Sequence, residues 1–151
     1  MVIWFTGQPG SGKTTLATEF YNRLISYTSE AVVHLDGDDL RDVLDNKDYS
    51  EKGRRKNIQF AINMTRVLDD KGFIVIVSMV SPYRDQREKL KSNRNITEFY
   101  LHTTEIRGKE DYFVDGYEPP LHNFTDINTD KTIEESVDEI FDVYRQMATL
   151  A

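Results

Sequence analysis

Residues 7–15 of this chain read GQPGSGKTT. The three glycines, one proline, one lysine and two threonines of this stretch favour neither a helix nor a strand. Gly7, four further residues and then Gly12-Lys13-Thr14 match the pattern G-x-x-x-x-G-K-[ST] at every fixed position. The apolar run VIWFT (2–6) precedes the loop and an amphipathic stretch follows it, so the loop joins a predicted strand to a predicted helix. This pattern typically binds phosphate when it stands between a strand and a helix. We therefore prefer a phosphate-binding loop to the alternative, a glycine-rich turn that matches the pattern by chance.

The chemistry of a triphosphate explains this composition. Several backbone N–H groups must surround the anion, and glycines let the loop curl because they carry no Cβ. The positive end of a helix beginning near Gly12 would face the anion. Lys13 would reach the β- and γ-phosphates, and the Thr14 hydroxyl would hold Mg²⁺. The predicted ATP site comprises Gly7, Gln8, Pro9, Gly10, Ser11, Gly12, Lys13, Thr14 and Thr15, with Lys13 also counted as catalytic.

The bulk composition excludes several classes of protein. The chain has 151 residues, which is enough for one compact domain, and a net charge of -7. That charge repels phosphate polymers and anionic lipid, so we expect no nucleic acid polymer and no membrane as partners. No cysteine is present, so disulfides and thiolate metal sites are absent. No secretory signal or long apolar run is found, which predicts a cytoplasmic protein.

Apolar runs alternate with amphipathic stretches along the chain. Strands are predicted at 2–6, 31–35, 73–78, 96–101 and 124–128, and helices at 13–28, 51–71, 83–92 and 133–147. The second and third strands are nearly continuous apolar runs, as in parallel strands covered on both faces. This alternation predicts an α/β fold with three layers: a five-stranded parallel sheet with helices on both faces, in one domain spanning 1–151.

The loop by itself does not separate switches, motors and kinases. The only candidate guanine reader, NKDY at 46–49, lacks the required aspartate and lies too early in the chain. The apolar strand FIVIVS ends in Ser78, where a motor ATPase usually has an acid. Acids instead follow the second strand in HLDGDDLR (34–41), at a strand end where ligands collect. Asp38 there either accepts a proton from a substrate hydroxyl or caps a short helix.

Basic residues follow these acids. Arg41, Arg54, Arg55 and Lys56 are close together in an acidic chain, and SPYRDQR adds Arg84 and Arg87. A solvated helix face is the ordinary explanation of such a run. An acceptor that already carries phosphate or sulfate would use planar arginine partners, and this points to phosphorylation of a small anionic nucleotide acceptor.

Four motifs resemble, in order and spacing, those of the adenylylsulfate (APS) kinases. They are GQPGSGKTT, LDGDDLR (35–41), YSEKGRRKNI (49–58) and VSPYRDQR (80–87). The resemblance implies a P-loop kinase, a phosphotransferase that uses ATP and Mg²⁺ to phosphorylate the ribose 3′-hydroxyl of adenosine 5′-phosphosulfate, giving PAPS for sulfate assimilation. A homodimer is compatible with it.

The resemblance also implies roles for individual residues. Asp38 would assist the attacking hydroxyl, and Asp36 would lie beside the metal, so Thr14 and Asp36 are the predicted metal ligands. The acceptor site implied by the motifs consists of Asp36, Arg41, Tyr49, Arg54, Asn57, Val80, Ser81 and Phe113. Ser81 before Pro82 also has the sequence of an ordinary helix N-cap.

The chain departs from the family pattern in its lid, the basic segment after the fourth strand. Only a short lid, at about 102–121, is present, in which Arg107 and Lys109 could reach phosphates and Tyr112 or Phe113 could cover the acceptor base. Gly53-Arg54 stands where the family usually has Asp-Arg. These departures leave two alternatives open: a kinase for a related nucleotide such as cytidine diphosphoramidate, and a non-catalytic nucleotide-binding regulatory module.

Overall fold

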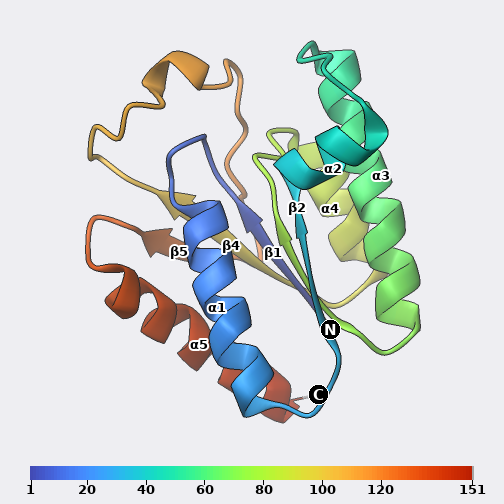
Figure 1. Ribbon diagram of the computed structural model, residues 1–151, viewed down its shortest axis with the longest axis vertical. Coiled ribbons are helices and arrows are strands. Elements are labelled where there is room, and N and C mark those ends of the chain that lie inside the picture. Colours follow the sequence, from blue (N-terminus) through green and yellow to red (C-terminus); the bar gives the residue numbers. More distant parts are fainter. Residues whose placement is uncertain (151) are drawn as a thin grey trace.

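The computed structural model describes residues 1–150. One parallel sheet contains five strands in the order β2-β3-β1-β4-β5 (Figure 1). Their bounds are Val2–Thr6 for β1, Val32–Asp36 for β2, Ile74–Ser78 for β3, Ile96–His102 for β4 and Thr125–Asn128 for β5. Every predicted strand is therefore confirmed, with ends that differ by at most one residue.

Helices cover both faces of the sheet, which confirms the predicted three-layer α/β fold (Figure 1). On one face lie α1 (Lys13–Tyr27) and α5 (Ile133–Leu150), and on the other lie α2 (Gly37–Leu44), α3 (Glu51–Asp70) and α4 (Arg84–Asn93). The lid is the connection between β4 and β5, residues 103–124, and the only helix described in it is the short 3-10 helix η1 (Glu110–Tyr112). No helix within residues 1–150 is both long and apolar enough to cross a membrane.

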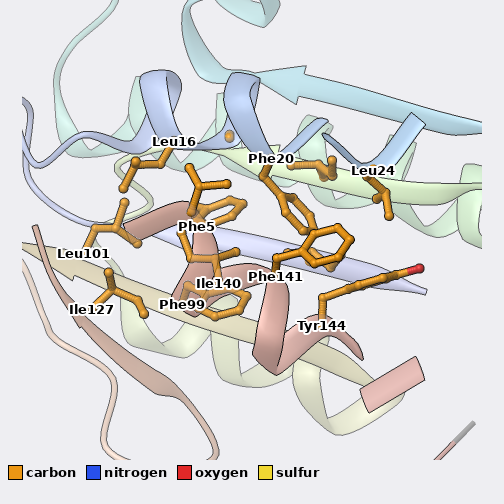
Figure 2. Packing of buried hydrophobic residues seen from close by; sticks show 14 of the residues in the cluster. Phe5, Leu16, Phe20, Leu24, Phe99, Leu101, Ile127, Ile140, Phe141 and Tyr144 are labelled. Carbon is orange, nitrogen blue, oxygen red and sulfur yellow. The ribbon is translucent and has the colours of Figure 1, made fainter. Parts of the chain in front are cut away.

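Five aromatic side chains pack together in the core between the sheet and the helices α1 and α5, which we call the aromatic core (Figure 2). The rings of Phe5 and Phe99 stack with centroids 5.2 Å apart. Phe20 of α1 meets Phe5, Phe141 and Tyr144 edge-on. Edge-to-face pairs add stabilisation to the burial of apolar area, so this cluster holds α1 firmly on the sheet. The loop that precedes α1 is thereby fixed in position.

A second core, between the sheet and the helices α2, α3 and α4, explains why strand sequences such as that of β3 are almost continuously apolar. Val2 and Trp4 of β1 point to the face covered by α2, α3 and α4, whereas Ile3 and Phe5 point to the aromatic core. In β3, Val75 and Val77 likewise alternate with Ile74 and Ile76. A strand buried on both faces has no polar side, and this produces the near-absence of alternation in its sequence.

The strand order brings three functional segments to one end of the sheet. Because all pairs are parallel, the carboxyl ends of β1, β2 and β3 lie together. Asp36 at the end of β2 pairs in register with Ser78 at the end of β3, which pairs in turn with Phe5 of β1. The phosphate-binding loop, or P-loop (residues 7–15), leaves this end, and the lid stands over the same end of the molecule (Figure 1). The site is therefore built from loops that are distant in sequence.

Candidate active site

The P-loop curls around the start of α1. Gly10 (φ 83°) and Gly12 (φ 101°) have left-handed backbone conformations, which favour glycine. Gly7 is required for another reason, since a Cβ there would lie 2.4 Å from the carbonyl oxygen of Leu101. No side chain caps α1, which begins at Lys13. Its first backbone N–H groups are therefore available to an anion.

Lys13 is buried, and within residues 1–150 its hydrogen-bond partners are neutral. Its Nζ donates to the carbonyl oxygen of Gln8 at 2.9 Å and to the Ser11 hydroxyl at 3.5 Å. Burial lowers the pKa of Lys13 to about 8, while the charges of Asp36 and Asp38 act in the opposite direction. A phosphate would supply the negative charge that these neutral partners lack.

The carboxylate of Asp36 is held by three hydrogen bonds. Oδ1 accepts from the Thr14 hydroxyl at 2.8 Å and from the Ser78 hydroxyl at 2.6 Å. Oδ2 accepts from the backbone N–H of Asp38 at 3.3 Å. Asp36 is thus the N-cap of α2. The alternative in which Asp38 is the cap is wrong, because the cap lies two residues earlier.

Asp38 is exposed and lines the main pocket. It lies in the first turn of α2, where its negative charge faces the positive end of the helix. Its charge also raises the pKa of Lys13, which indicates that the two groups are close. Its side chain forms no hydrogen bond within the described part of the chain, so its carboxylate remains free for a substrate hydroxyl.

One pocket of about 940 Å³ contains most of the predicted site. From the P-loop it is lined by Pro9, Gly10, Gly12, Lys13, Thr14 and Thr15. Gly7, Gln8 and Ser11 do not line it; Ser11 is buried, and the side chain of Gln8 contacts the lid. From the predicted acceptor site it is lined by Asp36, Arg41, Tyr49, Arg54, Asn57, Val80, Ser81 and Phe113. The structure therefore brings the ATP loop and the acceptor residues into one cavity.

Two polar side chains that line this pocket have unused bonding capacity. Asn57 is buried, and its Oδ1 has no hydrogen-bond partner within residues 1–150. Arg54, one turn earlier on α3, forms no ion pair in the same part of the chain. A buried amide oxygen without a partner is costly in a folded protein. Together they leave one acceptor atom and one positive charge available to a ligand.

Arg41 supports the loop that carries Tyr49. Its guanidinium lies 4.1 Å from the centroid of the Tyr49 ring, and its Nη1 donates to the carbonyl oxygens of Asn46 at 2.9 Å and Asp48 at 3.2 Å. The same loop packs over α3 at Gly53, where a Cβ would lie 2.1 Å from the Asp48 carbonyl oxygen. Gly53 in place of an aspartate thus allows the loop to approach α3 closely.

The remaining members of the basic cluster do not line the main pocket. Arg55 pairs with Glu51 and Asp85, and Lys56 is exposed outside the pocket. Arg84 donates to the carbonyl oxygen of Pro119. Arg87 is buried, where it pairs with Glu98 and donates to the carbonyl oxygens of Ser81 and Glu118. Apart from Glu51, which lies one turn before Arg55 on α3, the acidic partners Asp85 and Glu98 lie on other elements than the arginines they pair with, and the local sequence did not reveal them.

Ser81 lines the pocket but does not cap α4. The residue preceding α4 is Tyr83, and no side chain caps that helix. Ser81 has a left-handed backbone (φ 39°), and its hydroxyl accepts from the Trp4 indole at 3.0 Å and contacts Thr6 at 3.1 Å. The predicted cap is therefore wrong, and the hydroxyl instead joins this turn to β1.

The lid contacts the P-loop directly. Arg107 donates through Nη1 to the carbonyl oxygen of Gly10 at 3.1 Å, whereas Lys109, Tyr112 and Phe113 line the main pocket. A second hollow of about 390 Å³ is lined by P-loop residues Gly12 and Thr15 together with residues of the lid and of the start of α5. The polar residues that line it include Thr15, Arg107, Lys131 and Thr132.

The donor set at Thr14 and Asp36 fits Mg²⁺, which prefers oxygen ligands and keeps several waters or phosphate oxygens. Within residues 1–150 no three acidic, histidine or cysteine side chains form a metal-binding group. A cation at this place would therefore take most of its ligands from phosphate and water.

Two groups behind Asp36, Ser78 and His34, were not among the predicted site residues. The Ser78 hydroxyl has one hydrogen, which goes to the carboxylate, so His34 must donate to Ser78 through Nε2–H at 2.7 Å. Burial lowers the pKa of His34, with Asp36 and Asp39 acting against it. The polar Ser78 at the end of an apolar strand was the available signal, whereas nothing local pointed to His34.

Residues 1–129 match the family model for adenylylsulphate kinase. The adenylyl-sulfate kinase of Oceanobacillus iheyensis is 32% identical over 162 residues, covering 92% of this chain and 81% of that protein. Alignments with several other curated relatives cover between 15% and 67% of those proteins, and many of them span about half.

Solved structures share the fold. The Mycobacterium tuberculosis APS kinase CysC, in complex with AMPPNP and APS, has a TM-score of 0.80 at 23% identity, covering 95% of this chain and 96% of that one. A hexameric APS kinase from Thiobacillus denitrificans has a TM-score of 0.74 at 25% identity, covering 93% of this chain and 27% of that one. With the family model matching most of its length, this chain belongs to the adenylylsulfate kinase family.

Proposed function

We propose that this protein transfers the γ-phosphoryl group of ATP to the ribose 3′-hydroxyl of adenosine 5′-phosphosulfate, giving PAPS. One observation carries the proposal: a single pocket joins Lys13 and Thr14 of the P-loop to the free carboxylate of Asp38 and to the unpaired groups of Arg54 and Asn57. Family membership supports the same reaction.

On the ATP side, the triphosphate would lie in the P-loop against the first N–H groups of α1 and the ammonium of Lys13. Thr14 and Asp36 would hold Mg²⁺, which neutralises charge on the phosphates when bound. The nucleoside would occupy the hollow of about 390 Å³ beside Thr15, which Arg107 also lines. This arrangement leaves the main pocket free for the acceptor.

On the acceptor side, the anionic tail would contact Arg54 and the remaining donors of Arg41. The Oδ1 of Asn57 would accept from a hydroxyl or amino group of the acceptor, which removes the cost of its burial. Tyr49 and Phe113 are exposed aromatic rings on opposite segments of the pocket lining, suited to a nucleobase.

Asp38 would orient the acceptor hydroxyl toward the γ-phosphorus and accept its proton. The transition state of phosphoryl transfer is loose and spreads charge over oxygen atoms, so positioning and charge neutralisation supply most of the rate. Lys13 provides a positive charge that is already held in place by Gln8 and Ser11. General acid–base help of the kind assigned to Asp38 contributes about 10²- to 10⁴-fold.

The test measures ADP release from Mg-ATP with adenosine 5′-phosphosulfate, cytidine diphosphoramidate, AMP or no acceptor, and identifies the product by mass spectrometry. ADP release with adenosine 5′-phosphosulfate, accompanied by PAPS, is the expected result. Release with cytidine diphosphoramidate alone would keep the reaction type and replace the acceptor. Release with none of them would favour a nucleotide-binding module without turnover. Lys13→Ala serves as the inactive control.

A further inference from the structure

The side chain of Gln8 forms a two-point contact with the lid. Its Nε2 donates to the carbonyl oxygen of Val114 at 3.0 Å, and its Oε1 accepts from the Val114 N–H at 2.8 Å. Both distances are those of good hydrogen bonds. The amide thereby satisfies both backbone groups of one buried residue 106 positions further along the chain. A side chain needs both a donor and an acceptor to do this, and a carboxamide has both.

Phosphate binding does not require this side chain. Position 8 is unspecified in the P-loop pattern, because the loop holds phosphate through backbone N–H groups. Gln8 does not line either of the two pockets described above. The backbone carbonyl oxygen of Gln8 contributes to the P-loop by accepting a hydrogen bond from Lys13 at 2.9 Å, whereas the Gln8 side chain bonds to the lid.

A second contact holds the other end of the same lid segment. Arg107 donates to the carbonyl oxygen of Gly10 at 3.1 Å. The lid also packs closely here, since a Cβ added to Gly10 would lie 3.0 Å from the Cβ of Lys109. Residues 108–113 are therefore fixed at both ends by P-loop residues 8–10. Between these two anchors stand Lys109 and Phe113, which line the acceptor pocket.

We propose that Gln8 is a positioning residue for the acceptor: by holding Val114 it places Phe113 in the pocket, so a P-loop residue controls acceptor affinity without contributing to ATP affinity. This inference rests on the proposed function for the identity of the acceptor. Without the two hydrogen bonds, the anchored lid is a smaller fraction of the population. Apparent acceptor affinity falls in proportion to that fraction.

The test compares Gln8→Leu with the wild type. Losing two hydrogen bonds should reduce the anchored fraction by about 10-fold, which raises the acceptor KM by about 10-fold. The affinity for a fluorescent ATP analogue with Mg²⁺, measured without acceptor, should change by less than about 2-fold, because backbone groups bind the phosphates. Gln8→Glu should show the same split, since its carboxylate cannot donate to the Val114 carbonyl oxygen. Gln59→Leu is the matched control, because Gln59 is exposed on α3 and its side chain donates to Asn63, a neighbour on the same helix.

Hydrogen exchange of the nucleotide-free protein gives a readout that does not depend on turnover. The Val114 amide and the peptide covering 108–114 should exchange faster in both Gln8 variants, with wild-type rates in Gln59→Leu. If hydrogen exchange of residues 108–114 is unchanged in the Gln8 variants, Gln8 does not anchor the lid. If the variants lose ATP affinity and acceptor affinity equally, Gln8 is not a positioning residue for the acceptor. If no acceptor supports ADP release in the wild type, the proposed function fails, and the exchange rates alone decide whether Gln8 anchors the lid.

Discussion

The buried ammonium of Lys13 should make the nucleotide-free protein less stable than a variant without it. Burial lowers the pKa of Lys13 from 10.5 to about 8. With about 1.4 kcal/mol for each pKa difference of one, the charged form destabilises the fold by about 3 kcal/mol. Replacing Lys13 by Met removes this penalty and also the hydrogen bonds to Gln8 and Ser11. A net gain of about 2 kcal/mol raises the melting temperature by about 4–8 °C in a chain of this size.

The direction of the pH dependence follows from linkage. Between pH 8 and 10.5 the unfolded wild type binds more protons than the folded protein, so its free energy of unfolding rises with pH across this window. The Met variant lacks this titration. The stability difference between the two proteins should therefore be largest below pH 8 and shrink toward pH 10.5.

Urea unfolding followed by the fluorescence of Trp4 measures both effects, at pH 7 and at pH 10. Trp4 is the only tryptophan and lies in the core. Lys52→Met, an exposed substitution on α3, is the matched control and should show neither effect. Mg-ATP should raise the wild-type midpoint more than that of Lys13→Met, which retains the backbone N–H groups but lacks the ammonium. A Lys13→Met protein that is less stable at pH 7, or a difference independent of pH, would refute the reasoning.

Three further substitutions test other parts of the site. Asp38→Asn should lower kcat by about 10²- to 10⁴-fold with little change in ATP binding, as measured by steady-state kinetics; a normal kcat would exclude a role in proton transfer. Arg54→Ala should raise the acceptor KM by about 10- to 100-fold, the effect of losing a charged hydrogen bond, whereas an equal rise in the ATP KM would contradict its acceptor assignment. Gly53→Ala places a Cβ 2.1 Å from the Asp48 carbonyl oxygen. Gly53→Ala should lower the free energy of unfolding, measured in urea, by about 1–3 kcal/mol. The exposed substitution Gln59→Ala on the same helix is its control and should have no such effect. An unchanged urea midpoint for Gly53→Ala would show that the loop at Asp48 shifts without an energetic cost.

The sequence did not reveal which arginines of the basic cluster are paired in the folded protein. Arg54 and Arg87 look alike in the sequence, as arginines of a basic cluster near a phosphate-binding loop. In the structure Arg54 lines the pocket unpaired, within residues 1–150, whereas Arg87 is buried against Glu98. Glu98 lies eleven residues away on β4, so the pairing depends on how α4 packs on the sheet. The partner of a long charged side chain is chosen by the fold and not by its neighbours in sequence.

The predicted helix caps were wrong for a related reason. Asp38 and Ser81 both have the residue type of a cap, yet Asp36 caps α2 and no side chain caps α4. Ser81 is turned toward β1 by its hydrogen bonds to Trp4 and Thr6. Local propensity was outweighed by contacts that cross the sheet.

The strands, most of the helices, the P-loop and the family could be predicted from the sequence, because hydrophobic periodicity and the spacing of glycines act within a few residues of the backbone. Only the folded structure showed which distant groups meet: His34 and Ser78 behind Asp36, Glu98 beside Arg87, and Gln8 on Val114. These contacts join segments that are far apart in the chain. They exist because parallel strands bring their carboxyl ends to one edge of the sheet, a geometry that no short stretch of sequence contains.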